Sequence, residues 1–280
     1  MLMTDTPTSA APTVRRELAV TRVRHPLKLR LAQVTRVRPI TPHLIRVTLS
    51  GPDLQGFESG SFDDHVKVFF PADGASKPVL PNVGPDGPVE EPGAARPIMR
   101  DFTPRRFDPV GGQLDLEFAL HDAGPATTWA ARAEIGHCLG IGGPRGAMII
   151  PTAFDWHLLV GDDTALPAIA RRLEELPRGV RAMVLVEVAG SAAEMDFESQ
   201  ADVDVIWCHR GAEGAGLPAA LAGLAAFPPG EGYAWAAAEA AIVRQIRMHL
   251  VTVRGLDRSR IRAAAYWKSG SHAIHEVLED

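Results

Sequence analysis

The chain has 280 residues, enough for about two domains of ordinary size, and its 46% hydrophobic and 22% charged residues are typical of a globular protein. The formal net charge of −5 argues against nucleic-acid binding, so an anionic ligand must meet a local group of basic side chains. No segment resembles a signal peptide or a membrane span, so we expect a cytoplasmic protein that is not inserted in a membrane. We also expect a monomer.

In chain order, residues 1–24 are rich in Thr, Ala and Pro and then turn basic, which indicates a disordered tail. Residues 25–150 follow as a first domain of short strands. β-Branched residues, near-alternation of apolar and polar residues, and Pro and Gly at the breaks predict strands at 29–37, 43–49, 65–70, 96–103, 113–121 and 138–150. Six such strands predict a small antiparallel β-barrel.

Residues 71–97 contain many Pro and Gly residues and support no regular element. Loops of this length are uncommon unless they are functional or disordered. We interpret the segment as a mobile excursion, with a lid over a ligand site as the alternative.

After Pro151 the pattern changes to alternating strands and helices, which predicts a doubly wound parallel α/β domain over residues 151–280. The expected elements are strands at 156–160, 181–188, 203–207, 232–237 and 261–266, and helices at 166–176, 217–227 and 240–253. Cys138 and Cys208 form no metal-binding or CxxC spacing, so we expect both to be small core residues. No His pattern indicates a metal site.

The first candidate site is the strand with R-D-F-T at 100–103, followed by a helix that Gly124-Pro125 opens. This pairing suits a bound flavin dinucleotide, because a helix N-terminus offers N–H groups to phosphates and Pro costs nothing in a first turn. Arg100 can bind phosphate oxygens, and the Thr103 hydroxyl can donate to the ring nitrogen that accepts hydride. The alternative is an ordinary strand with surface arginines. His121 either shapes the turn or faces the flavin ring, and Trp129 is better explained as core packing.

The second candidate site lies at strand ends of the second domain, where α/β sheets bind nucleotides. V-G-D-D-T at 160–164 opens a helix, and we expect Thr164 to be its N-cap; the two aspartates there would repel a nearby pyrophosphate. Arg210, with His209, can bind a ribose 2′-phosphate and favour NADPH, whereas Glu187 can hold a ribose hydroxyl and favour NADH.

Y-W-K at 266–268 closes the last strand of the second domain. The two aromatic rings can cover a flavin or nicotinamide ring, and Lys268 can face an anionic substrate. The alternative is a C-terminal packing cluster.

These motifs occur in a recognisable order: R-D-F-T-P-R, H-D-A-G-P-A-T-T-W-A, G-G-P-R-G, G-D-D-T-A-L-P-A-I and Y-W-K-S-G. P-H-L-I-R-V-T-L-S-G-P-D-L and D-D-H-V-K-V-F-F-P precede them. Over roughly residues 25–275 the chain resembles the siderophore-interacting proteins, a branch of the ferredoxin-reductase-like flavoproteins. The resemblance implies a flavin-binding barrel, a nicotinamide-binding α/β domain, and FAD-dependent reduction of ferric siderophores by NADPH or NADH with release of ferrous iron.

The same resemblance implies site residues. Thr103 and Lys268 would be catalytic, with Lys268 beside the substrate. From the resemblance and the residue chemistry together, the residues that we expect to bind the cofactors are Arg100, Asp101, Phe102, Thr103, His121, Asp122, Gly124, Ala126, Thr127, Trp129, Asp162, Thr164, Arg210 and Trp267.

Three departures from the family pattern keep other functions open. Phe102 replaces a usual Tyr, and Ala238 and Ala265 replace usual glycines, where a methyl group can clash with a nucleotide. One alternative is therefore the same reduction with electrons from a ferredoxin-type protein. The other is a flavin-bearing siderophore-binding protein without enzymatic activity.

Overall fold

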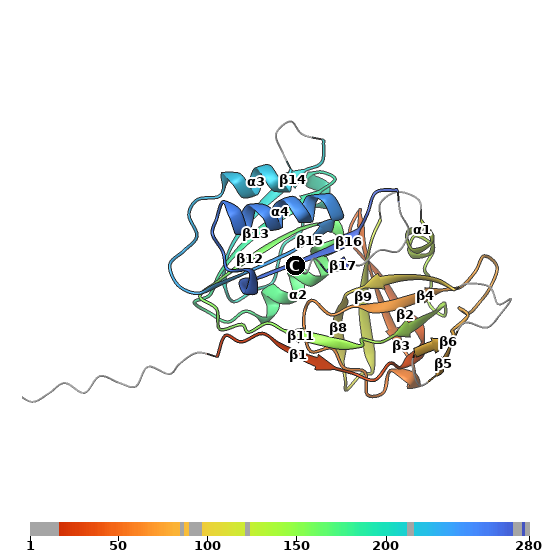
Figure 1. The fold of residues 1–280 in the computed structure, drawn as a ribbon. Helices are drawn as coiled ribbons and strands as arrows, with labels where there is room; N and C mark the ends of the chain where they lie inside the picture. The colour runs from red at the N-terminus through yellow and green to blue at the C-terminus, as the bar shows by residue number, and fades with distance from the viewer. Residues whose placement is uncertain are drawn as a thin grey trace, which may run out of the picture.

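The computed structural model describes residues 17–84, 87–89, 97–120, 124–211, 216–270 and 276–277, and Figure 1 shows two β-rich halves side by side. The first half is a seven-stranded antiparallel sheet with the strand order β7-β4-β10-β2-β3-β9-β8. Its strands are β2 (Leu29–Thr41), β3 (Leu44–Ser50), β4 (Val66–Phe70), β7 (Ile98–Phe102), β8 (Pro104–Asp108), β9 (Gln113–Ala119) and β10 (Cys138–Gly142).

This sheet curls strongly, because its two edge strands are consecutive in the chain. β7 and β8 lie at opposite ends of the strand order, and only Thr103 separates them. The two edges must therefore meet at Thr103, as the predicted barrel requires. The count of six strands was wrong: β8, which carries two arginines and begins at Pro104, gave no strand signal, and residues 138–150 form two strands, broken at 143–145.

The second of those two strands, β11 (Gly146–Ile149), pairs with β1 (Thr21–Arg24) in a separate two-stranded antiparallel sheet. The predicted tail therefore ends earlier than residue 24, and residues 1–16 lie outside the described residues. All four β1 side chains are exposed, which explains the missing hydrophobic signal. The segment 71–97 also holds a hairpin, β5 (Asn82–Gly84) and β6 (Gly87–Val89), so the absence of regular structure expected there was wrong. A short 3₁₀ turn, η1 (Pro52–Leu54), follows β3.

The second half is the predicted parallel sheet, in the order β14-β13-β12-β15-β16, with the antiparallel β17 (Glu276–Val277) added at the edge. The parallel strands are β12 (Trp156–Asp162), β13 (Arg181–Val188), β14 (Asp202–His209), β15 (Gly232–Glu239) and β16 (Ile261–Trp267). A short 3₁₀ turn follows β12 (η2, Asp163–Ala165), another follows β13 (η3, Ser191–Ala193), and a third precedes β16 (η4, Arg258–Arg260).

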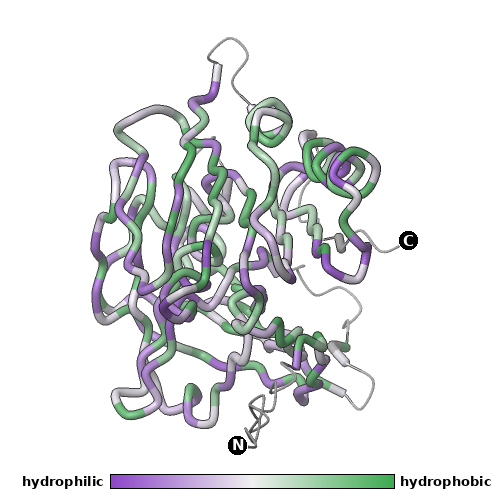
Figure 2. The backbone as a smooth tube through the Cα atoms, turned by 90° about the vertical axis from the view of Figure 1, so that its left-hand side faces the viewer, coloured by the Kyte–Doolittle hydropathy of each residue, from purple (hydrophilic) through white to green (hydrophobic). Residues whose placement is uncertain are grey.

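Three helices cover the two faces of this sheet. α2 (Leu166–Glu175) packs on the face toward the barrel and touches β8, whereas α3 (Leu217–Gly223) and α4 (Ala240–Thr252) share the opposite face (Figure 1). Figure 2 shows that hydrophobic and hydrophilic stretches alternate along the backbone. The core under α2 includes Leu44 and Phe62 of the barrel, so the hydrophobic core continues from one domain into the other.

Both cysteines are free and buried, which confirms their predicted place in the core. Among the described residues, no helix is long and apolar enough to cross a membrane.

Candidate functional site

An aromatic cluster in the barrel brings the two predicted flavin motifs together. The Phe102 ring of β7 lies 4.5 Å from that of Phe118 on β9, and Phe118 lies 5.6 Å from Trp129. Trp129 belongs to the short helix α1 (Pro125–Ala130) and also contacts Phe70 of β4 at 5.8 Å. The strand that carries R-D-F-T and the helix that follows Gly124-Pro125 are therefore neighbours, although about 20 residues separate them in the chain.

The beginning of α1 fits the prediction made for it. Gly124 is an extended N-cap, Pro125 occupies the first turn, and of the described residues none caps the helix with a side chain. The N–H groups of half-buried Ala126 and Thr127 lie in this uncapped first turn. The structure does not describe His121 and Asp122, so their predicted roles fall outside it.

On β7, the polar side chains beside Phe102 have partners within the barrel. Half-buried Arg100 donates to the Met99 carbonyl at 2.7 Å, and Asp101 accepts from Lys67 at 2.9 Å. The Arg100 contact uses one of the five N–H donors of its guanidinium, whereas Lys67 binds both carboxylate oxygens of Asp101, the second at 3.1 Å.

Thr103 is buried where β7 and β8 meet, and its hydroxyl forms a hydrogen bond with that of Tyr266 on β16. Burial raises the pKa of Tyr266 far above its ordinary value, with a further contribution from the Asp63 carboxylate. Tyr266 is therefore a neutral hydroxyl at any physiological pH. The contact places the C-terminal part of β16 in the second domain against the barrel residue predicted to be catalytic.

Asp162 ends β12 as a buried carboxylate with three donors. It accepts from the Thr164 amide at 3.0 Å, the Thr164 hydroxyl at 2.5 Å and Trp267 Nε1 at 2.7 Å. Burial, and then the neighbouring Asp163 carboxylate, raises the pKa of Asp162 to about 6. The expected cap was misplaced: Asp162 caps η2, and α2 begins after Ala165 without a side-chain cap, so Thr164 is a donor to the cap. An aspartate two residues earlier in the sequence was the signal for this arrangement.

Arg210 and Glu187, which in the sequence favoured NADPH and NADH respectively, form an ion pair with each other. Arg210 donates to Asp163 at 2.9 Å and lies 3.5 Å from Glu187. Burial alone would lower the pKa of Arg210, but the hydrogen bond and the surrounding carboxylates raise it. The Arg210 guanidinium in turn offsets part of the negative charge at this end of the sheet, which the sequence suggested would repel a pyrophosphate.

The C-terminal end of β16 turns to the surface. Trp267 is 42% exposed even though its indole N–H binds Asp162, and exposed Lys268 follows directly. Ala238 and Ala265, by contrast, are fully buried in the sheet. Their methyl groups pack against protein, so they are not at a surface that a nucleotide would approach.

Sequence reasoning missed the polar residues that join the two domains. The Asp63 carboxylate, in the barrel, accepts from Trp235 of β15 and Arg262 of β16. Arg105 of β8 pairs with Glu174 of α2. In the sequence, these residues are marked only by two adjacent aspartates before β4 and two adjacent arginines after Pro104. Neither pattern indicates which residue of the second domain will be the partner.

Comparison with known proteins assigns the family. A model described as a siderophore-interacting FAD-binding domain matches residues 33–148, and one described as siderophore-interacting protein matches residues 154–270. An NADPH-dependent ferric-chelate reductase of Escherichia coli is 35% identical over 250 residues, which are 88% of this chain and 95% of that protein. The chain belongs to the siderophore-interacting protein family.

Further relatives agree with this assignment. A ferric vibriobactin reductase of Vibrio cholerae is 32% identical to this siderophore-interacting protein over 88% of the chain and 93% of its own length. The crystal structure of a siderophore utilization protein from T. fusca has 40% identity and a TM-score of 0.83, covering 91% of this chain and 98% of that one. A ferredoxin reductase of carbazole 1,9a-dioxygenase, at 16% identity and a TM-score of 0.60 over 85% of this chain and 69% of that one, shares the fold.

Proposed function

We propose that this siderophore-interacting protein is a reductase that uses FAD to pass electrons from NADPH to ferric siderophores and so releases ferrous iron. The observation that carries the proposal is the meeting of three elements at one seam. The aromatic cluster joins β7 to α1, and Tyr266 of β16 reaches Thr103 at the end of β7. The strand, the helix and the sheet edge that we propose to face the flavin ring, its pyrophosphate and the nicotinamide nucleotide are thus adjacent.

The donors present on the barrel suit FAD. The uncapped N–H groups of Ala126 and Thr127 would bind the pyrophosphate, and Arg100, which has spare N–H donors, would add positive charge. The Thr103 hydroxyl would bind the edge of the ring at the domain seam. FAD supplies chemistry that no side chain here offers, since it accepts a hydride and can release electrons singly.

The second domain would bring NADPH to that seam. Its carboxyl strand ends carry Asp162, Trp267 and Arg210, which lie where open α/β sheets bind nucleotides. We propose that Arg210 turns from Asp163 and Glu187 toward the 2′-phosphate. The name of the Escherichia coli relative supports NADPH, and the burial of Ala238 and Ala265 removes the steric reason for preferring a ferredoxin-type donor.

The products follow from the coordination chemistry of iron. Siderophores hold Fe³⁺ through hard oxygen donors, and Fe²⁺, with less charge, binds such donors far more weakly. One NADPH would reduce two ferric chelates, giving NADP⁺, one H⁺ and two ferrous ions. No resident metal is required, because the iron arrives with the substrate and leaves as a product.

The decisive experiment is anaerobic. Purified protein loaded with FAD is mixed with NADPH, and bleaching of the flavin absorbance is followed by stopped-flow spectroscopy. A ferric siderophore and a ferrous chelator are then added, and the coloured ferrous complex is measured. We expect rapid bleaching and a ratio of two ferrous ions per NADPH. Bleaching only by reduced ferredoxin would support the other donor, and colourless protein that binds no flavin would refute the proposal.

Lys268 is our candidate for holding the substrate. It is an exposed cation beside the seam, in a protein whose net charge of −5 does not attract anionic chelates over long range. We expect Lys268→Ala to raise KM for an anionic ferric catecholate more than for a neutral ferric hydroxamate, and added salt to reduce the difference. Steady-state assays with a ferrous trap test this. An equal loss on both chelates would point to a packing or nucleotide-binding role.

A further inference from the structure

Asp63 is a buried carboxylate of the barrel whose two oxygens both bind the second domain. Oδ1 accepts from the indole N–H of Trp235 at 2.8 Å, and Oδ2 accepts from Nε of Arg262. The Asp63 side chain is 1% exposed and that of Arg262 is 11% exposed. Burial alone would lower the pKa of Arg262, but Asp63 outweighs this and raises it. Since the two donors come from neighbouring strands, β15 and β16, they fix the direction of the carboxylate as well as its distance.

The loop that carries Asp63 is also held from its other side. Arg171 of α2 donates to the Ser59 hydroxyl at 2.7 Å, the Ser59 carbonyl at 3.0 Å and the Pro104 carbonyl at 2.8 Å. The Phe62 ring lies edge-on to Trp235 at 5.5 Å. Asp64 closes the loop on itself by accepting from the Ser61 amide and the Ser59 hydroxyl. The segment 59–64 is therefore bound by α2 on one side and by β15 and β16 on the other.

The segment 59–64 is connected directly to the place where β7, Thr103 and β16 meet. The loop leads into β4, which pairs with β7, the strand that ends at Thr103. On the other side, Arg262 and Tyr266 belong to the same strand, β16, and four positions span about 13 Å along an extended strand. The Tyr266 ring lies 6.1 Å from that of Trp235, the residue whose indole N–H binds Asp63. Asp63 therefore holds one end of β16 against the barrel while Tyr266 meets Thr103 at the other end.

We infer that Asp63 is a positioning residue, which fixes the second domain at the angle that hydride transfer across the seam requires. The inference rests on the proposed function. Asp63 touches neither the predicted flavin strand nor the nucleotide edge, so it acts through the placement of β16. The geometry matters because a displacement of about 1 Å at reacting atoms can lower a rate about 100-fold.

The test compares Asp63→Asn, which removes the charge, and Trp235→Phe, which keeps the ion pair and removes one hydrogen bond. The matched control is Asp204→Asn, because Asp204 also pairs with an arginine, Arg181, but on the exposed surface of the second domain alone. Asp63→Asn leaves a buried cation without its partner, so the double variant Asp63→Asn/Arg262→Met, which lacks both charges, is measured beside it. Each protein is assayed for FAD affinity, NADPH affinity and the limiting rate of flavin bleaching.

We expect Asp63→Asn and the double variant to lower the limiting rate about 10- to 100-fold, and Trp235→Phe to lower it less, with FAD and NADPH affinities unchanged. Hydrogen exchange, measured without any cofactor, should accelerate in segment 59–64 and stay constant in β13. The Asp204→Asn control should match the wild type throughout.

Wild-type bleaching rates and wild-type exchange in Asp63→Asn would overturn the inference. Loss of FAD from the Asp63 variants would also overturn it, because the loop would then belong to the flavin site. If NADPH fails to bleach the wild-type flavin, the proposed electron donor is refuted instead. Exchange in segment 59–64 then decides alone whether Asp63 holds the domains together.

Discussion

Thr103 shows how one side chain can connect both domains. Its hydroxyl has one proton to donate and two lone pairs that accept, so it can bind Tyr266 and a flavin nitrogen at once. Tyr266 remains protonated, because burial raises its pKa. A neutral phenol can orient the threonine hydroxyl without bringing a charge next to the ring.

We expect Thr103→Val to slow flavin reduction by NADPH about 10-fold or more while changing FAD affinity little, since the lost donor acts on the ring edge where charge develops. Tyr266→Phe should slow reduction less, because the threonine donor remains. Stopped-flow bleaching and FAD titration measure the two effects. Identical bleaching rates in Thr103→Val and the wild type would remove Thr103 from the catalytic residues.

Asp162 makes a specific contribution to the pH dependence of stability. Its pKa is about 6 in the folded chain and, as for an ordinary aspartate, about 3.9 in the unfolded chain. The folded chain therefore binds more protons between these values, and the contribution of Asp162 to the free energy of unfolding decreases as the pH rises from about 4 to about 6. His157, whose pKa burial lowers to about 3, contributes with the opposite sign over an overlapping range.

We expect Asp162→Asn to gain stability relative to the wild type as the pH is raised from about 4 to about 6, by roughly 2–3 kcal/mol in total. His157 is present in both proteins, so the difference between them isolates Asp162. Urea unfolding at several pH values gives the two free energies. A difference that stays constant across this range would mean that Asp162 titrates normally in the folded chain.

At the scale of elements, the end of β12 is packed too closely for a side chain. A Cβ on Gly161 would lie 2.3 Å from the Ala165 Cβ and 2.8 Å from the Ala237 carbonyl oxygen. This close approach holds η2, and with it Asp162 and Thr164, against β15. The glycine in the G-D-D-T motif is thus explained by packing within the sheet.

We expect Gly161→Ala to lower the free energy of unfolding by about 1–3 kcal/mol through overpacking. The control is Gly190→Ala, where an added Cβ meets nothing within 4 Å and the backbone is extended, so the change should stay within about 0.5 kcal/mol. Chemical denaturation measures both variants. Equal losses at the two positions would show that backbone entropy, not contact with Ala165 and Ala237, limits Gly161.

The elements also show which signals the sequence carries. β13 lies where it was predicted, at Arg181–Val188, because its buried centre, residues 182–186, is a continuous apolar run. β8, β5 and β6 were missed, since P-R-R-F-D and the Pro/Gly-rich segment 71–97 have no apolar alternation; those strands form by pairing with neighbours. The flavin motifs were found from local chemistry. The contacts of Asp63 with Trp235 and Arg262 were not found. These partners lie 172 and 199 positions from Asp63 along the chain, so they meet only after folding.

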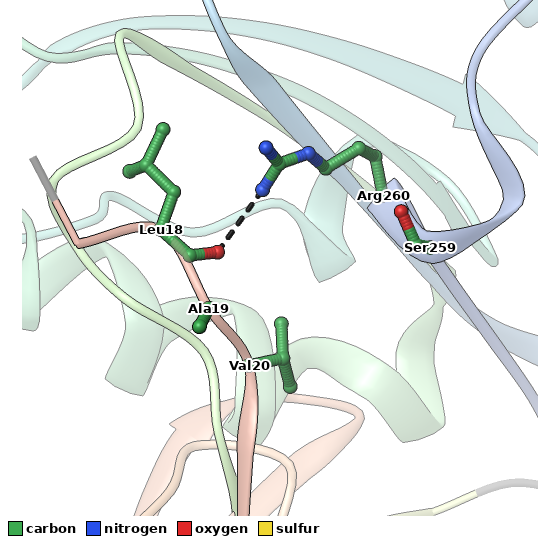
Figure 3. Close-up of a pocket in the computed structure, with 5 residues that line it drawn as sticks. All are labelled: Leu18, Ala19, Val20, Ser259 and Arg260. Carbon is green, nitrogen blue, oxygen red and sulfur yellow. Dashed lines mark hydrogen bonds between the residues drawn. The ribbon is translucent and has the colours of Figure 1, made fainter.

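At the scale of the whole molecule, the N-terminal segment is a further connection between the domains. β1 pairs with β11 of the barrel, and just before it Leu18 and Val20 pack on the core shared with the second domain. Arg260, in η4, donates to the Leu18 carbonyl at 3.0 Å (Figure 3). Its guanidinium also lies over the Phe154 ring. A cavity of about 440 Å³ lies beside these contacts, lined by Leu18, Ala19, Val20, Ser259 and Arg260.

We expect deletion of residues 1–20 to lower the apparent Tm by roughly 3–8 °C, because it removes two half-buried apolar side chains and the acceptor of Arg260. Deletion of residues 1–16 is the matched control, since every described contact of Leu18 and Val20 remains, and it should melt with the full chain. FAD affinity should be unchanged in both, because the described contacts of Leu18 and Val20 are with the core shared by the two domains and with Arg260. Differential scanning calorimetry measures the two transitions. If both deletions melt like the full chain, the segment contributes nothing to holding the domains together, and the shared core and the contacts of Asp63, Arg105, Arg171 and Tyr266 do so without it.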